Sequence, residues 1–275
     1  MIKIKNLDVK IKNKQILKKI NIDFETGKNY LLIWKNWSWK STLCSFLMWH
    51  PKYKHAWGEI IIDWDDLLWL CPRNRSLKWL FLSFQNIPEI KWVKLWEYLR
   101  TIYNIHYREE ENKSDFQSLD KINEDVDNNW CNKCCKSNQN KHFKWLTPLA
   151  FKKFIKSFLQ ELSIEESFLG RELNVWFSGW EKRKIEILQM RLIWPKYIIL
   201  DEIDSWLDLD AFKTIAKLLK NISTKENSLI IVTHNFDICD YIDIDEVHVI
   251  DNWKIVKKWG KEVIWEINKQ GFENL

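Results

Sequence analysis

Glycine is scarce in this sequence, with 6 residues among 275, whereas globular chains carry about 7% glycine. No apolar run reaches the roughly eighteen residues of a membrane helix, and the first residues, MIKIKNLDVK, contain no hydrophobic leader. The 6 Cys do not make a disulfide framework. The net charge of +5 is small and acidic and basic residues are interspersed, which argues against a nucleic-acid surface. These absences predict a cytoplasmic protein with no nucleic-acid partner and no direct membrane contact.

Tryptophan is as abundant as glycine is scarce, with 19 residues. Trp suits cores and interfaces, yet Trp37, Trp64 and Trp253 each follow Asn or Asp in turn-like contexts. Asn-Gly and Asp-Gly turns need a positive φ, which strains a bulky side chain. Counted together, the Trp and Gly residues make 25 of 275, about 9%, which is close to the usual share of glycine.

These positions lead to the hypothesis that the source organism reads UGA as glycine, so that the printed Trp residues are glycine in the native protein. The Lys-, Ile- and Asn-rich composition is typical of an AT-rich genome, in which UGA would be a favoured glycine codon. The alternative is a decayed relative of a functional protein, with real Trp residues. Random decay would not place one residue type selectively at glycine positions, so the recoding hypothesis is favoured.

Hydrophobic patterning predicts one α/β domain built of several parts. Strand-like alternation at the N-terminus predicts an antiparallel β part, and short apolar runs that end in polar residues predict the buried parallel strands of an α/β core. Apolar spacing near 3.6 residues predicts a helical subdomain, which a polar insertion interrupts. The predicted parts are the whole domain, 1–275; the β part, 1–33; the core, 34–94 and 176–272; the helical subdomain, 95–175; and the insertion, about 107–145.

The run WKNWSWKST at residues 34–42 satisfies the P-loop pattern G-x-x-x-x-G-K-[ST] when glycine replaces its three Trp. The pattern needs glycine because backbone N–H groups turn inward on the phosphates, where a side chain would fill the space. Lys40 would reach the β- and γ-phosphates and the Ser41 hydroxyl would ligate Mg²⁺. With Trp in place, the loop predicts no nucleotide binding. The expected ATP-binding residues are Trp34, Lys35, Asn36, Trp37, Ser38, Trp39, Lys40, Ser41 and Thr42.

Five later motifs stand in an order that resembles the ABC ATPase family. Each has an ordinary structural explanation when taken alone, such as a strand that ends in solvent, but five loop motifs in family order are improbable by chance. They are Gln85 in FLSFQN, resembling the Q-loop; VWFSGWEKRK (175–184), resembling the ABC signature; IILDE (198–202), resembling Walker B; DSWLD (204–208), resembling the D-loop; and His234 in IIVTHN, resembling the switch histidine.

This resemblance implies an ABC ATPase nucleotide-binding domain with a P-loop, RecA-like core, an antiparallel β subdomain and a helical subdomain. It implies ATP and Mg²⁺ as cofactors, with Glu202 as general base and His234 as the sensor of the γ-phosphate. The implied metal ligands are Ser41, Gln85 and Asp201. The signature residues Ser178, Gly179, Trp180 and Glu181 would contact the nucleotide of an opposite subunit, and Ser205, Trp206, Leu207 and Asp208 would form the D-loop.

Within that family the chain resembles the SufC ATPases of SUF iron–sulfur cluster assembly, over about residues 1–272. The stretches MWHPKY (48–53), FQNIPEIKWV (84–93) and RELNVWFSGWEKRKIEILQM (171–190) carry this resemblance, with Trp read as glycine. It implies SufB-like and SufD-like scaffold partners and a transient, ATP-driven homodimer of ATPase heads that does work on the scaffold. Lys35, where Pro is common, and the insertion depart from the pattern.

Alternatives come from other classes of protein. A transporter ATPase would pair with a membrane subunit, although such ATPases usually have Pro-Thr after the Walker B glutamate and use LSGGQ. Real Trp residues would imply an inactive pseudo-ATPase scaffold. Trp interleaved with Lys suggests a base-stacking platform, which the turn placement disfavours. Cys131, Cys134, Cys135 and His142 resemble half a zinc site without a second, better spaced pair, so free thiols in the insertion are favoured.

Overall fold

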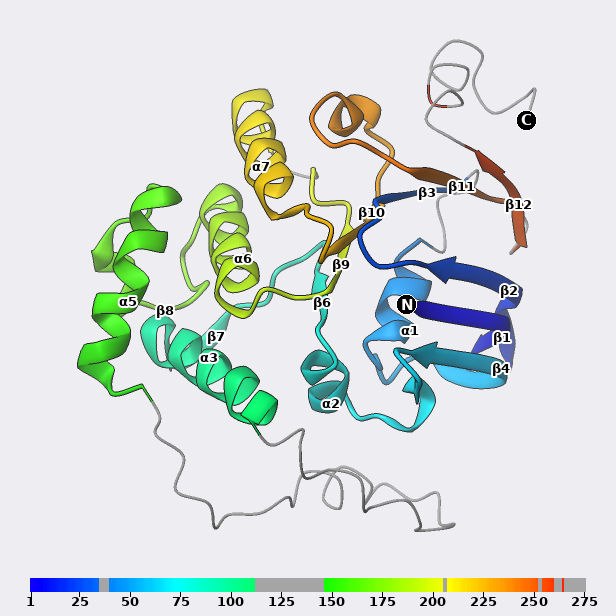
Figure 1. Ribbon diagram of the computed structural model, residues 1–275, viewed down its shortest axis with the longest axis horizontal. Helices are drawn as coiled ribbons and strands as arrows, with labels where there is room; N and C mark the ends of the chain where they lie inside the picture. The colour runs from blue at the N-terminus through cyan, green and yellow to red at the C-terminus, as the bar shows by residue number, and fades with distance from the viewer. Residues whose placement is uncertain (35–39, 112–145, 205–206, 252–253, 260–263, 265–275) are drawn as a thin grey trace. The chain divides into compact units, whose positions relative to one another are not determined.

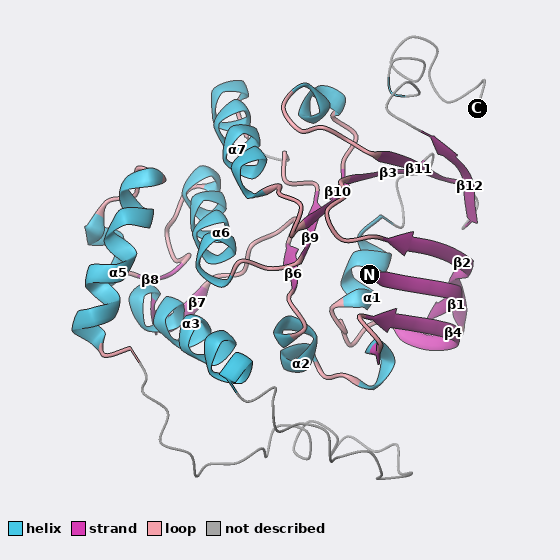
Figure 2. Ribbon diagram, in the orientation of Figure 1, coloured by secondary structure: helices cyan, strands magenta, loops and turns pink. Residues whose placement is uncertain are grey.

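The computed structural model describes residues 1–34, 40–111, 146–204, 207–251, 254–259 and 264 (Figures 1 and 2). The chain falls into two units. Unit 1 comprises Met1–Pro88, Trp176–Met190 and Trp194–Leu275 and contains both large sheets, and unit 2 comprises Glu89–Val175 and Arg191–Ile193 and is mainly helical. No helix in the described ranges has the length and apolarity needed to cross a bilayer.

A six-stranded sheet in the order β12-β11-β3-β10-β9-β6 forms the centre of unit 1 (Figure 2). The strands β11, β3, β10, β9 and β6 pair in parallel, so their carboxyl ends meet at one edge. The segments YIILD and SLIIV are buried at every position, as expected of strands covered on both faces. The strands are β3 (Tyr30–Trp34), β6 (Leu80–Ser83), β9 (Tyr197–Asp201), β10 (Ser228–Val232), β11 (Glu246–Asp251) and β12 (Lys254–Trp259).

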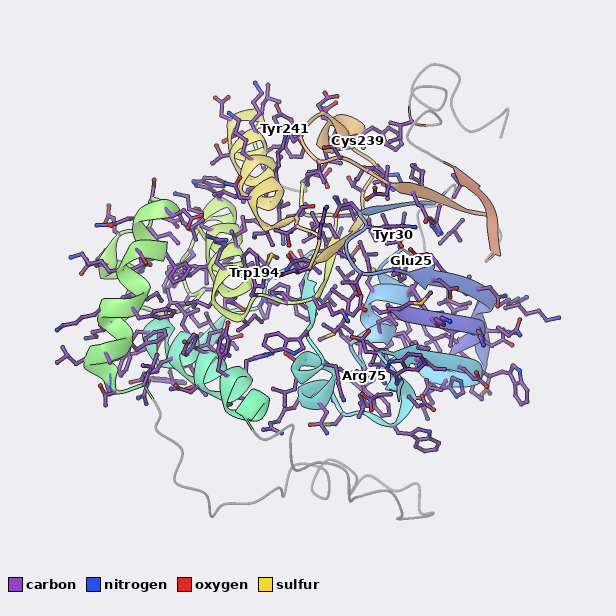
Figure 3. The ribbon with its side chains drawn as sticks, viewed as in Figure 1. Glu25, Tyr30, Arg75, Trp194, Cys239 and Tyr241 are labelled. Carbon is purple, nitrogen blue, oxygen red and sulfur yellow. The ribbon has the colours of Figure 1, made fainter. Side chains whose placement is uncertain are left out.

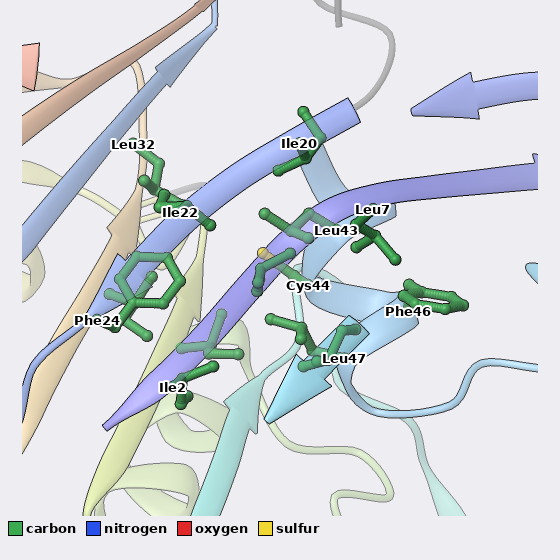
Figure 4. Close-up of a cluster of buried hydrophobic side chains, with 14 of the residues drawn as sticks. Ile2, Leu7, Ile20, Ile22, Phe24, Leu32, Leu43, Cys44, Phe46 and Leu47 are labelled. Atoms are coloured by element: carbon green, nitrogen blue, oxygen red, sulfur yellow. The ribbon is translucent and has the colours of Figure 1, made fainter. Parts of the chain in front are cut away.

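An antiparallel sheet in the order β2-β1-β4-β5 supplies the second layer of unit 1. Its strands are β1 (Ile2–Ile11), β2 (Lys14–Phe24), β4 (Lys54–Ile62) and β5 (Asp65–Asp66). Strand β1 pairs antiparallel with β2 on one side and with β4 on the other. Alternating residues of β1 and β2 are buried, and they form one core with Leu43, Cys44, Phe46 and Leu47 of α1 (Lys40–Leu47) (Figure 4). Helix α1 follows β3 in the chain, and this packing fixes it against the antiparallel sheet.

Arg75 holds the carboxyl end of α1 (Figure 3). It lies on α2 (Pro72–Leu77) and is fully buried, and its guanidinium donates to the carbonyls of Phe46 at 2.9 Å, Leu47 at 2.7 Å and Leu70 at 2.8 Å. The last carbonyls of a helix lack partners within the helix, so a buried cation there is favourable. Burial lowers the pKa of Arg75 to about 10, which still leaves it charged at neutral pH.

Unit 2 contains two longer helices and a short antiparallel pair of strands. Helix α5 begins after Thr147, whose hydroxyl accepts from the Ala150 N–H at 3.3 Å as an N-cap. Tyr103 stacks against the aromatic side chains of α5, including Phe151 and Phe154. The elements of unit 2 are α3 (Leu95–Glu111), α5 (Pro148–Glu161), η3 (Glu166–Gly170), β7 (Ile90–Lys94) and β8 (Glu172–Leu173).

The remaining elements of unit 1 are η1 (Leu67–Trp69), η4 (Phe236–Asp240) and α7 (Leu209–Ile222). Helix α6 (Gly179–Ile193) begins in unit 1.

Six tryptophans among the described residues occupy left-handed backbone positions. Thirteen non-glycine residues there have positive φ, and six of them are Trp: 49, 64, 79, 92, 176 and 194. Trp49 has φ 62° just after α1, where its N–H donates to Phe46 O and the His50 N–H donates to Ser45 O, both at 2.9 Å. These two bonds make the Schellman motif, whose left-handed position is usually Gly. Trp79 and Trp194 occupy left-handed positions at the carboxyl ends of α2 and α6.

The turn between β4 and β5 places the same demand on Trp64. Its two central residues are Asp63, with φ 44°, and Trp64, with φ 82°, and the flanking Ile62 and Asp65 pair across the turn. Positive φ at both central residues is the requirement of a type I′ hairpin, which favours Asp-Gly. Trp64 is 98% exposed, so its indole contributes no burial that would offset the strain. Six of the twelve described Trp residues thus have a glycine-like backbone conformation.

We predict that Trp64→Gly, made in the printed chain, raises the free energy of unfolding by about 1 kcal/mol, because glycine adopts positive φ without a Cβ clash. Trp57→Gly is the matched control: Trp57 is 70% exposed but lies within β4 without a positive φ. Glycine weakens a strand interior, so this control lowers stability or leaves it unchanged. Urea unfolding measures both; equal effects of the two substitutions would contradict the conformational argument.

Candidate functional site

Four neighbouring parallel strands deliver the candidate residues to one edge of the large sheet of unit 1. Strand β6 leads to Gln85, β9 to Asp201 and Glu202, and β10 to His234. Strand β3 ends at Trp34, and α1 begins at Lys40 on the far side of the loop. Ligands of open parallel sheets bind outside the carboxyl ends of the strands, so this edge is the candidate site.

Glu202 lies at the centre of the described part of the site. Its Oε2 accepts a hydrogen bond from Gln85 Nε2, and its Oε1 is 4.0 Å from His234 Nε2. These three side chains come from the ends of β6, β9 and β10. The Glu202 and His234 side chains are partly exposed, which leaves the carboxylate accessible to a ligand. The structure therefore brings together the side chains of Gln85, Glu202 and His234.

The backbone at Glu202 is strained. Its φ is 50°, in the left-handed region, and its N–H donates to the Val232 carbonyl of β10 at 2.8 Å. Such outliers cost about 1–3 kcal/mol and cluster at functional sites, where the surroundings hold them in place. The neighbouring Asp201 is buried as the last residue of β9. The backbone bend thus directs two adjacent acidic residues differently, one into the protein and the other toward its edge.

Asp204 follows in the same loop and is tied to the end of β10. Its Oδ1 accepts from the Thr233 hydroxyl at 2.9 Å, and Thr233 Oγ1 in turn accepts from the Asn235 N–H at 2.9 Å. Burial raises the pKa of Asp204, and the Thr233 hydrogen bond offsets part of this rise. The bonds join the segments before and after His234 to the loop that carries Glu202, which limits their independent movement.

Ser178 and Glu181 form a capping box at the start of α6. Ser178 Oγ accepts from the Glu181 N–H at 3.3 Å, and Glu181 Oε2 accepts from the Ser178 N–H at 2.7 Å. Gly179 and Trp180 are the first two residues of the helix. The free N–H groups at a helix N-terminus attract anions, so this end suits a phosphate as well as a cap. Capping is a second role for Ser178 and Glu181, and their S-x-x-E spacing was a sequence signal for it.

Several predicted site residues lie outside the described residues: Lys35, Asn36, Trp37, Ser38 and Trp39 of the P-loop, Ser205 and Trp206 of the D-loop, and the cysteine-containing insertion with His142. For Trp34 and Lys40 only the backbone position is described. Ser41 and Thr42 lie in the first turn of α1. Asp208 is the N-cap of α7, accepting from the Ala211 N–H at 2.8 Å, and Leu207 precedes it.

The donor set of Ser41, Gln85 and Asp201 consists of a hydroxyl, an amide and a carboxylate, which are the hard oxygen ligands that Mg²⁺ prefers. Over the described ranges, no three His, Cys, Asp or Glu side chains gather as a metal cluster. Mg²⁺ is usually held by one or two carboxylates, with water and substrate phosphates completing its shell. The residues therefore fit Mg²⁺ that arrives with a nucleotide.

A buried ion pair that no sequence motif indicates lies beside the site. Arg183 and Glu186 lie one turn apart on α6, with Arg183 Nη1 2.7 Å from Glu186 Oε2 and side chains 4% and 5% exposed. The pair contacts the segment that carries Gln85. Opposite charges at i and i+3 were a visible signal in EKRKIE, but such spacing is common on exposed helix faces and does not reveal burial.

The structure of the chain resembles solved nucleotide-binding domains. One is the ATP-binding cassette MJ0796, solved as a dimer in a post-hydrolysis state bound to ADP and Pi, with a TM-score of 0.68 and 17% identity over 94% of this chain and 98% of that chain. Another is an ATP binding subunit of an ABC transporter, with a TM-score of 0.69 and 17% identity over 98% of this chain and 93% of that chain. The fold is that of an ABC ATPase nucleotide-binding domain, which confirms the predicted fold class.

Relatives in sequence define the family. The chain is 36% identical to the probable ATP-dependent transporter ycf16 of Antithamnion sp., over 100% of this chain and 97% of the relative. It is 32% identical to the probable ATP-dependent transporter slr0075 of Synechocystis sp., over 100% and 95%, and 31% identical to the chloroplastic ABC transporter I family member 6 of Arabidopsis thaliana, over 94% and 68%. No protein-family model matches the chain. The chain belongs to the family of ycf16-like ABC ATPases.

We predict that Ser178→Ala lowers the free energy of unfolding by about 1 kcal/mol, the usual cost of a lost N-cap. Ser178→Asp keeps a capping oxygen and retains most of this stability. Thr147→Ala removes the cap of α5 in unit 2 and serves as the matched control, with a loss of similar size. Chemical denaturation measures all three; an unchanged midpoint for Ser178→Ala would contradict the capping role.

Proposed function

We propose that the chain is an ATP-binding and ATP-hydrolysing ABC subunit. The observation that carries this proposal is the convergence of Gln85 and His234 on the Glu202 carboxylate, at the sheet edge where α1 begins. A general base must be oriented and accessible, and Glu202 has both properties. Names and folds of the relatives support the same class of activity.

Within this site each residue has one proposed role. Lys40 and the backbone of residues 34–42 would bind the phosphates. Ser41, Gln85 and Asp201 would hold Mg²⁺, which would neutralise charge at the phosphates. Glu202 orients and deprotonates the attacking water, and His234 donates to the terminal phosphate. The other proposed contacts, to the nucleotide of a second copy of the head, come from Ser178, Gly179, Trp180 and Glu181 and from the D-loop residues Ser205, Trp206, Leu207 and Asp208.

We further propose that the printed Trp residues are glycine in the native protein, which makes the ATPase activity conditional on this exchange. A P-loop with indoles at Trp34, Trp37 and Trp39 does not fit a phosphate, because its backbone N–H groups must face the ligand directly. The six positive-φ Trp residues, three of them at helix ends and one in a type I′ turn, support the exchange independently of the P-loop. A pseudo-ATPase scaffold remains the alternative if the Trp residues are real.

We propose the SUF iron–sulfur cluster assembly system as the setting, with SufB-like and SufD-like scaffolds as partners. The SufC-like stretches at 48–53, 84–93 and 171–190 support this assignment. Two heads would close on ATP, and the higher affinity of ATP for the closed pair would do work on the scaffold. The alternative is the ATPase subunit of an ABC transporter, with which the names of the relatives are compatible.

The activity is tested in a full-length glycine form, in which all 19 Trp are replaced by Gly. We predict that this form binds MgATP and hydrolyses it, whereas the same form with Trp34, Trp37 and Trp39 retained loses at least 100-fold in affinity. Retaining Trp57 and Trp69, which are both exposed and lie outside the P-loop sequence, is the matched control and leaves binding unchanged. Calorimetry and phosphate release measure the two quantities; equal binding with Trp at the P-loop would contradict the proposal.

Catalytic roles are separated from structural roles by two further variants of the glycine form. Glu202→Gln should lower kcat at least about 100-fold while ATP still binds, because a general base contributes about 10²–10⁴ in rate. Thr147→Ala should leave kcat unchanged despite its lower stability. An active Glu202→Gln variant would remove Glu202 from the proposed role.

The partner assignment is tested by co-purification from the source organism with the tagged native chain. We predict that SufB-like and SufD-like proteins are recovered, since the SufC-like stretches imply those scaffolds. Recovery of a membrane permease in their place would support the transporter alternative and overturn the SUF assignment.

A further inference from the structure

Two buried charged residues of α6 hold the segment that carries Gln85. Arg183 Nη1 donates to the Phe84 carbonyl at 2.7 Å and to Ser83 Oγ at 3.0 Å, and Nη2 donates to the Gln85 carbonyl at 3.3 Å. Glu186 accepts from the Ser83 hydroxyl at 2.7 Å and from the Phe84 N–H at 3.2 Å. One pair of side chains thus binds the Ser83 hydroxyl, the N–H and carbonyl of Phe84, and the Gln85 carbonyl.

The same guanidinium reaches the loop that carries the proposed general base. Arg183 Nη2 lies 3.5 Å from the carbonyl of Glu202, whose own backbone is in the left-handed conformation. Glu202 in turn accepts from Gln85 through its side chain. Arg183 therefore contacts the backbone of both residues whose side chains meet, and it can fix the distance between them.

The burial of Arg183 and Glu186 is not explained by a gain in the stability of the fold. Two nearly fully buried charges lose their hydration, and buried ion pairs are often no more stable than apolar residues of similar size. Burial raises the pKa of Glu186, and the Arg183 guanidinium with the Ser83 and Phe84 donors offsets part of this rise. The hydrogen bonds that the pair makes to residues 83–85 and to the Glu202 carbonyl indicate a positioning role.

We infer that Arg183 and Glu186 are positioning residues that hold Gln85 and Glu202 at a fixed spacing from α6, the helix whose N-terminus carries Ser178. The inference rests on the proposed ATPase function, in which Gln85 and Glu202 belong to one head and the start of α6 contacts the nucleotide of the other. The pair then links the two nucleotide contacts of a single head through buried, charge-assisted hydrogen bonds.

The test compares single and double replacements in the full-length glycine form. Arg183→Met leaves Glu186 without its ion-pair partner, whereas Arg183→Met with Glu186→Leu removes both charges and restores an apolar interior. A structural ion pair predicts that the double variant recovers both stability and kcat. A positioning pair predicts that the double variant folds stably while kcat stays at least ten-fold below that of the parent and KM for ATP changes less than about three-fold. Arg183→Lys, which keeps the charge but not the fork, should rescue kcat in part.

The matched control removes another ion pair of the same helix. Arg191 lies near the end of α6 and pairs with Glu161 at 3.2 Å; both residues belong to unit 2, whereas residues 83–85 belong to unit 1. Arg191→Met with Glu161→Leu should leave kcat and KM unchanged.

Hydrogen exchange of the peptide 83–88 gives a readout that does not depend on turnover. The inference predicts faster exchange there in the double variant, with unchanged exchange in β9 and β10. Unchanged exchange at 83–88, or recovery of kcat in the double variant, would overturn the inference. A parent that fails to hydrolyse ATP would overturn the proposed function, while the exchange measurement would still decide whether the pair holds this segment.

Discussion

Parallel pairing of β3, β10, β9 and β6 is the constraint on which the site depends. Because these strands are buried and in register, residues far apart in the chain leave the sheet at the same edge. Gln85 and Glu202 are separated by 117 positions and still share a hydrogen bond. The antiparallel sheet packs against one face of α1, and Arg75 binds the carbonyls at its carboxyl end. Lys40 and Ser41 therefore lie at the start of a helix whose position is fixed.

The second constraint is the left-handed backbone conformation, which limits the residue types that fit at certain positions. A left-handed residue in a Schellman motif or a type I′ turn favours glycine for a steric reason that acts on any sequence. The structure places Trp at such positions after α1, α2 and α6 and in the β4–β5 turn. The proposed phosphate-binding loop at residues 34–42 would need glycine for a related reason, since its N–H groups would have to face the ligand. Glycine in place of Trp would satisfy both the left-handed positions and the loop.

Much of the fold could be predicted from short-range pattern. The alternation of β1 and β2 and the apolar runs of β9 and β10 are strong signals of strands. Strand β4 was not predicted, because KHAWGEIII has no clean alternation over its first half. The capping box of Ser178 and Glu181 is local and follows the S-x-x-E pattern, whereas the burial of Arg183 and Glu186 depends on which face of α6 is covered. That choice is made by tertiary packing, which neither the helical period nor a motif specifies.

The identity of the residues at positions 34, 37 and 39 decides between a working ATPase and a scaffold that does not bind nucleotide. Mass spectrometry of the native protein, with sequencing of the peptide that spans residues 34–40, measures it directly. The account predicts glycine at all three positions and an intact mass well below the 33.6 kDa of the printed chain. Tryptophan at these positions would contradict it, because the loop could not then surround a phosphate.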